Sequence, residues 1–412
     1  MKLQLSILKI SSLYANRFTI FTHLFHVEKF KMSTISQVIF DQNVDSCTGF
    51  AVKNGGETIS IVDHFQNNRF NLLHGKRRGI LIVLAICAFI INGAHDFLMF
   101  KSVQFIPDVS PLVVGANQTI YIFLVGDACL GFGFCLAFWY KIDFTEFSLK
   151  WSQSHLITPK FSPLKTLARL NKSLNLLLIF IMFASISAVA NIIYLIITQT
   201  NRDEHGFNVT LAVIHMASHF LMPLLFTHQL YLLFASTVTV KSLFTQIGKQ
   251  IKSHTKSTWS AAKLSHYRQQ YALAIELANE ANNIWSQYLA FFYPSINLMA
   301  IIFVYYIISG PINIYRYFIF AQIAGSIFLL IFYLNHYIIG INTEASSIYD
   351  IVYEKTFYSK NVNYLSEINL FLDRIGRENV GYRFEGFVYS PGLVASTLTL
   401  IVTIIIAFPS FV

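Results

Sequence analysis

The feature that most constrains the fold is an uncharged, apolar stretch of 20 residues that runs from position 393 to position 412. At about 1.5 Å per residue, a helix of this length crosses the roughly 30 Å hydrocarbon layer of a bilayer. Its small and hydroxylated residues follow one another at spacings of three or four, and therefore share one helical stripe: Ser396, Thr399, Thr403, Ala407 and Ser410. Such a stripe serves either close helix packing or the lining of a narrow water path shared among subunits.

The composition predicts an all-α membrane protein that crosses the bilayer several times. The chain is 54% hydrophobic and only 12% charged, whereas soluble domains carry about a quarter charged residues. After a polar N-terminal segment, residues 1–78, we expect seven transmembrane helices. Their approximate spans are residues 79–100, 120–140, 174–198, 211–240, 289–309, 317–340 and 393–412.

The distribution of Lys and Arg predicts an inverted topology, with the N-terminus inside and the C-terminus outside. If residues 1–78 are cytoplasmic, 27 of the 30 cationic side chains fall in cytoplasmic segments, as the positive-inside rule requires. Two N-glycosylation sequons, at Asn117 and Asn208, then fall in outside loops. This orientation is opposite to that of a G-protein-coupled receptor, and the short motifs of that class are also missing.

Two cytoplasmic segments carry apolar seams of helical period. The first repeats at alternating spacings of three and four over about three heptads, and we expect its helix to continue into the fifth span. Its members are Leu264, Tyr267, Tyr271, Ala274, Ala278, Ala281, Trp285 and Tyr288. The second comprises Leu365, Ile368, Leu372 and Ile375, with Gly376 placed to end the helix. Both seams need apolar partners, which we expect to be each other and neighbouring subunits.

The C-terminal residues resemble the insect-type gustatory receptor family, which is related to the odorant receptors. The resemblance rests on the cytoplasmic helix that begins at Tyr364, on Phe384 to Phe387 and on the closing family signature. That signature is Thr-Tyr, five hydrophobic residues and Gln-Phe. Counted from Gly386 and Phe387, Thr403 and Phe411 match it, whereas Ile404 replaces the Tyr and Ser410 replaces the Gln.

The resemblance implies a ligand-gated cation channel in the plasma membrane, typically of chemosensory neurons. In this family four subunits, identical or different, surround a pore formed by their last helices, and cytoplasmic helices form an anchor domain where the subunits meet. The ligand is a small tastant or odorant, bound within each subunit's membrane bundle. Carried to this chain, the gate falls on Ser410 and Ala407, both on the stripe described above. The resemblance therefore favours the pore over simple packing.

Ionisable residues inside membrane spans are costly, and they suggest functional positions. Asp127 lies midway along the second span, where it is either functional or a protonated or paired acid that packs the bundle. His95 and Asp96 lie at the outer end of the first span, where a ligand could reach them.

Four residues of the fourth and fifth spans are further candidates for an outer ligand pocket. His215 and His219 lie one helical turn apart, but no third ligand is evident, so we predict no metal site there. Tyr305 and Tyr306 could form an apolar pocket wall.

No catalytic motif is present in the sequence, so we predict neither an enzyme nor a bound cofactor. The basic residues flank apolar runs, which favours membrane orientation over nucleic-acid binding. Three alternatives remain: a G-protein-coupled chemoreceptor, a transporter, and a non-conducting subunit of a receptor complex. A transporter predicts repeated halves and broken helices, and the sequence has neither feature.

Overall fold

The computed structural model describes the chain from residue 79 to residue 407 with gaps. Described throughout are residues 141–157, 209–255, 259–309, 314–358, 361–377, 380–384 and 387–407, together with parts of 79–90, 131–138 and 169–186. All of these belong to one compact unit, residues 61–412.

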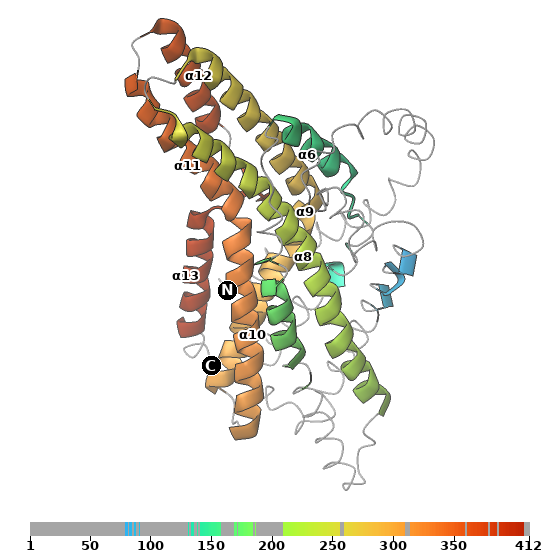
Figure 1. The fold of residues 1–412 in the computed structure, drawn as a ribbon. Helices are drawn as coiled ribbons and strands as arrows, with labels where there is room; N and C mark the ends of the chain where they lie inside the picture. The colour runs from blue at the N-terminus through green and yellow to red at the C-terminus, as the bar shows by residue number, and fades with distance from the viewer. Residues whose placement is uncertain are drawn as a thin grey trace, which may run out of the picture. The chain divides into compact units, whose positions relative to one another are not determined.

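Three long helices and the shorter α11 form the main body of this unit: α8 (Val209–Ser253), α9 (Ala261–Ser309), α10 (Ile314–Ile338) and α11 (Gly340–Glu354). α8 packs against α9 and α11, and α9 also packs against α10 (Figure 1). Among the described residues, three helical stretches are long and apolar enough to cross a membrane: Leu225–Ser253, Ala261–Val304 and Ala321–Tyr358. Two shorter apolar helices, Lys172–Phe183 and Pro391–Ile404, accompany them.

The remaining elements are short. They are α6 (Thr145–Ile157), the 3₁₀ helix η4 (Lys355–Tyr358), α12 (Val362–Arg377) and α13 (Pro391–Ala407). Strands β1 (Arg383–Phe384) and β2 (Phe387–Val388) form an antiparallel hairpin between α12 and α13, in which Arg383 pairs with Val388.

Short polar side chains begin several of these helices, because they accept hydrogen bonds from the first backbone N–H groups. Asp143 accepts the Thr145 N–H at 3.0 Å before α6, and Asn361 accepts the Asn363 N–H at 2.9 Å at the start of α12. Before α13, Ser390 Oγ accepts the Leu393 N–H at 3.3 Å, and Pro391 occupies the first helical position, which tolerates proline.

The predicted heptad seam of α9 forms the centre of the core, and all eight of its residues are buried. Trp285 is fully buried and meets the rings of Phe138, Phe144 and Tyr288 at centroid distances between 5.5 and 6.2 Å. As predicted, this helix continues without interruption into the fifth span, since α9 runs from Ala261 to Ser309.

The two predicted seams also meet each other, because α12 packs against α9. Tyr271 of α9 and Phe371 of α12 are in edge-to-face contact at 5.6 Å. The buried face of α12 is, however, partly different from the predicted seam. Ile368 and Ile375 are buried as expected, but the other fully packed residues of that face are Tyr364 and Phe371.

Two helices extend beyond the predicted points. Gly376 lies inside the last turn of α12, which extends to Arg377. α8, which contains the predicted fourth span, continues as one helix past residue 240 to Ser253. α6 and α11 were not predicted at all. α11 follows α10 after a single turn residue, Ile339, so its apolar pattern merged with that of the sixth span.

The other predicted spans are only partly described. Described residues within 79–90, 131–135 and 169–186 are helical, and the remaining residues of the first three spans lie outside the described part. The inverted topology and the count of seven spans therefore stay predictions.

Candidate functional site

The last helix, α13, has one face that packs against the rest of the chain and another face that is exposed. Its buried or half-buried residues are Leu393, Val394, Thr397, Ile401, Ile404 and Ala407, and α13 packs against α9. Ser396, Thr399 and Thr403 of the predicted stripe are all exposed. At about 100° per residue, the centre of these three residues lies about 120° around the helix from the centre of the packed face. In a single chain, the three hydroxyl residues of the stripe on the described helix are therefore exposed, whereas Ala407 of the same stripe is half-buried.

The threonine hydroxyls of the stripe are oriented by their own helix. Thr399 Oγ1 donates to the Ala395 carbonyl at 2.9 Å, and Thr403 Oγ1 donates to the Thr399 carbonyl at 2.8 Å. A hydroxyl has one proton but two acceptor lone pairs, so each oxygen keeps acceptor capacity on the exposed side. Such oxygens can accept hydrogen bonds from water or contact a cation.

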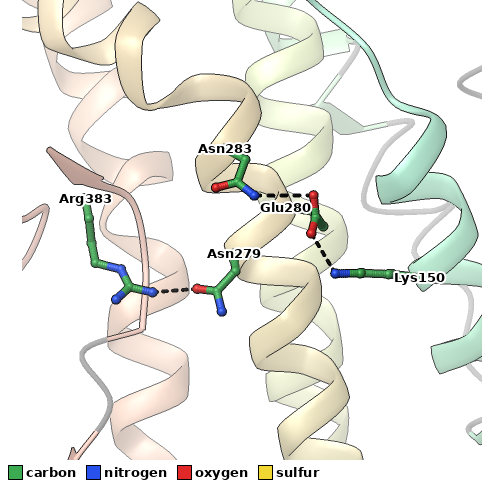
Figure 2. A network of polar contacts seen from close by, with 5 residues as sticks. All are labelled: Lys150, Asn279, Glu280, Asn283 and Arg383. Atoms are coloured by element: carbon green, nitrogen blue, oxygen red, sulfur yellow. Dashed lines mark hydrogen bonds and ion pairs between the residues drawn. The ribbon is translucent and has the colours of Figure 1, made fainter. Parts of the chain in front are cut away.

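The hairpin that precedes α13 is attached to α9 by polar contacts. Asn282 Oδ1 accepts the backbone N–H of Arg383 at 2.6 Å, and the guanidinium of Arg383 donates to Asn279 Oδ1. Figure 2 shows Arg383 reaching from β1 to Asn279 on the adjacent turn of α9. This attachment links the segment that enters α13 directly to α9.

The same turn of α9, residues 279–283, also forms polar contacts with α6. Lys150 Nζ donates to Glu280 Oε1 at 2.6 Å, and Asn283 Nδ2 donates to Glu280 Oε2 at 3.5 Å (Figure 2). The hydrogen bond to Glu280 raises the pKa of the Lys150 ammonium. One turn of α9 thus connects two segments that are more than two hundred residues apart in the chain.

Two buried tyrosine hydroxyls connect the segment that precedes α13 to α8 and α9. Tyr382 Oη and Thr237 Oγ1 are 2.7 Å apart, and Thr237 also donates to the Leu233 carbonyl at 2.7 Å. Because Thr237 has only one proton, Tyr382 is the donor in the first pair. Burial raises the pKa of Tyr382 to about 12. Close by in the chain, Tyr389 donates to the Leu289 carbonyl at 3.3 Å.

Gly381, directly before Tyr382, has a backbone conformation that only glycine readily adopts. Its φ of +138° is favoured by glycine alone, and it is the only positive-φ glycine among the described residues. A Cβ at this position would come within 3.3 Å of Cβ of Asn342. Asn342 donates to the Val380 carbonyl at 3.0 Å, so the segment before the hairpin is also tied to α11.

Most of the sequence-predicted site residues cannot be located in the described structure. His95, Asp96, Asn117, Asp127, Asn208, Gly386, Ser410 and Phe411 lie outside the described residues. His215 and His219 of α8, and Tyr305 and Tyr306 of α9, are helical, but their side chains are not described. Ala407 is half-buried at the end of α13, and Phe387 is exposed on β2.

Sequence analysis missed the polar turn of α9 and the residues that it binds. Asn279, Glu280, Asn282 and Asn283 interrupt the alanine-rich and aromatic sequence of α9, and this local density of polar residues was the available signal. No group of three or more His, Cys, Asp or Glu side chains suitable for a metal ion occurs among the residues that the structure describes.

Comparison with known proteins identifies the fold. The sequence matches none of the protein-family models or curated proteins with which it was compared. Among the solved structures that resemble the chain are two of the insect olfactory receptor OR5 from Machilis hrabei. The structure in complex with eugenol has a TM-score of 0.58 and 12% identity, and covers 84% of this chain and 91% of that receptor. The second has a TM-score of 0.57 and 13% identity, and covers 87% of this chain and 93% of the receptor.

The chain has the fold of an insect olfactory receptor. The similarity extends over most of both chains. At 12–13% identity it establishes the architecture and leaves the activity to be argued from the residues themselves.

Proposed function

We propose that this protein is a chemosensory receptor of the gustatory type that works as a ligand-gated cation channel in the plasma membrane of chemosensory neurons. Its N-terminus lies inside and its C-terminus outside. Four subunits, identical or different, surround one pore, and a small tastant or odorant opens it. The single observation that carries this proposal is the unpacked hydroxyl stripe of α13 in a chain with an olfactory-receptor fold.

The chemistry of α13 supports a role as the pore helix. Its packed face is accounted for by α9, and the opposite face exposes Ser396, Thr399 and Thr403 together with aliphatic side chains. When four such helices meet around an axis, hydroxyl oxygens line the axis and the aliphatic flanks contact neighbouring helices or lipid. Hydroxyl acceptors without a formal charge suit weakly bound, rapidly moving cations. The gate is assigned to Ala407 and Ser410.

The contacts of the hairpin that precedes α13 support a mechanical connection between ligand binding and opening of the gate. The polar turn of α9 contacts the hairpin through Arg383 and contacts α6 through Lys150. A ligand that binds one arrangement of the bundle more tightly shifts α9, and α9 carries the entry to α13 with it. The energy for opening comes from the difference in ligand affinity between the closed and open states.

Substitution of threonine by valine tests the pore, because valine keeps the shape and removes the hydroxyl oxygen. We expect Thr399→Val and Thr403→Val to reduce ligand-evoked cation current several-fold at equal surface expression. Thr397→Val is the matched control, since Thr397 donates to the Leu393 carbonyl at 2.9 Å but is half-buried on the packed side. At the gate, Ser410→Ala and Ala407→Val should change conduction without changing surface expression.

Two outcomes would reject the proposal. Equal currents in all the variants would mean that α13 does not line the pore. A parent chain that reaches the surface and carries no current, with any tastant and with any co-expressed receptor subunit, would instead indicate a non-conducting subunit.

A further inference from the structure

The short apolar helix at Lys172–Phe183 meets α10 through a hydrogen bond between hydroxyl groups. Ser173 Oγ donates to Tyr333 Oη at 2.7 Å. Beyond this bond, both helices expose large apolar side chains, with Leu176 61% exposed on the first helix and Phe332 68% exposed on α10. In a protein that crosses a bilayer, such exposed aliphatic and aromatic surface faces lipid chains.

Two cationic side chains and one imidazole lie near the Ser173–Tyr333 hydrogen bond. The exposed apolar surface of the short helix begins at the same level. Arg169 and Lys172 are exposed one helical turn and one residue before Ser173, and His336 is exposed about one turn after Tyr333. We call these three residues the cationic edge. In the proposed topology the third span begins, and the sixth span ends, at the cytoplasmic side. All three residues then lie at the level of the inner leaflet's headgroups.

Arg169 and Lys172 differ from the three described cations that pair with an acid, and among the described residues they share the lack of an acidic partner with Lys249 and Lys252 of α8. Lys150, Lys241 and Arg268 each pair with a glutamate, at 2.6, 3.8 and 3.2 Å respectively. Arg169 and Lys172, by contrast, form neither an ion pair nor a hydrogen bond with any residue that the structure describes. Within the described part of the chain, no acidic group neutralises their charges.

We propose that the cationic edge binds the phosphoryl headgroup of an anionic lipid of the cytoplasmic leaflet. The headgroup contacts Arg169 and Lys172, with His336 as a further donor, and the acyl chains lie along Leu176 and Phe332. Clustered cations beside an apolar membrane surface are the arrangement that recognises anionic lipids. A guanidinium also contacts two phosphoryl oxygens at once, which favours phosphate over a simple carboxylate. The inference rests on the proposed membrane topology but not on channel activity.

The test measures lipid retention by the purified full-length chain in neutral detergent. Native mass spectrometry gives the fraction of protein that carries phosphatidylserine or phosphatidylcholine, added in turn at equal concentration. The test variant is Arg169→Gln with Lys172→Gln. The matched control is Lys249→Gln with Lys252→Gln, which makes the same charge change at exposed positions of α8, about two or three turns beyond the end of the fourth span.

We expect the parent and the control to retain phosphatidylserine in preference to phosphatidylcholine. The test variant should lose this preference by about 25-fold, since each cation near a membrane surface contributes a factor of about five. Equal retention by the test and control variants would overturn the proposal, as would a parent with no preference between the two lipids. A third arm adds millimolar inorganic phosphate: if phosphate alone displaces the lipid, the site binds free phosphate and the lipid assignment is wrong.

Lipid retention can be tested independently of the proposed channel activity. It requires folded protein but no ligand and no current, so a non-conducting chain can still retain phosphatidylserine. Conversely, a conducting chain without lipid preference would reject the cationic edge and leave the proposed channel intact. The melting temperatures of the two double variants should agree within about 1 °C, which excludes misfolding as the cause of lost lipid.

Discussion

We predict that Tyr382→Phe destabilises the protein at neutral pH and stabilises it at alkaline pH. Tyr382→Phe removes a buried donor to Thr237 Oγ1, 2.7 Å away, while Thr237 keeps its own bond to the Leu233 carbonyl. At neutral pH the variant should therefore be less stable than the parent by about 1 kcal/mol, the usual net contribution of one hydrogen bond.

At alkaline pH the same substitution should stabilise the protein. Burial raises the pKa of Tyr382 to about 12, compared with about 10 for a tyrosine in the unfolded chain. The folded state holds the proton longer, so the parent loses stability as pH rises from about 10 to about 12. By pH ~11.5 this loss amounts to about 2 kcal/mol, and phenylalanine does not incur it. The two effects cancel near pH ~10.7.

The assay is thermal melting of the detergent-solubilised chain, followed by tryptophan fluorescence between about pH 7 and pH 11.5. A difference of 1 kcal/mol should shift the melting temperature by about 1–2 °C in a chain of this size. Tyr353→Phe is the control, because it makes the same substitution at a tyrosine that is 50% exposed. If Tyr382→Phe stays less stable than the parent up to pH ~11.5, Tyr382 is not the buried donor described here.

Three further predictions concern the hairpin, the tip of α8 and the orientation of the chain. Gly381→Ala should lower the melting temperature, by the equivalent of about 1–3 kcal/mol, because φ is +138° there; Gly376→Ala, in the open last turn of α12, should instead raise it slightly. Burial, with smaller contributions from Lys263 and Lys355, lowers the pKa of His254. Stability should therefore fall as pH drops below about 6.5, and His254→Gln should flatten that dependence in melting curves. In intact cells, antibodies should label a C-terminal epitope tag but not an N-terminal one; the reverse pattern would refute the inverted topology.

Local periodicity in the sequence was sufficient to predict the centre of the fold. All eight seam residues of α9 are buried, and α9 continues into the membrane-length stretch as predicted. Ser396, Thr399 and Thr403 of the predicted stripe lie on one exposed face of α13, whereas Ala407 is half-buried. Such features are predictable because helical geometry places residues three and four apart on one face, whatever the rest of the chain does.

Helix ends and contacts between distant segments were not predictable in the same way. Gly376 has the character of a helix stop, yet α12 continues past it, since the packing of Ile375 and its neighbours outweighs the preference of one residue. α11 was missed because its apolar residues continue the pattern of α10 almost without a break.

The sequence alone predicted the mostly helical class, the core face of α9 and the shared face of Ser396, Thr399 and Thr403 on α13, because each follows from the order of residues along a single helix. Only the tertiary structure decided that one turn of α9 holds both Lys150 and Arg383, and that Tyr382 donates to Thr237. These pairs are separated by more than one hundred residues. A hydrogen bond across such a distance depends on where whole helices pack, and no local pattern of residues carries that information.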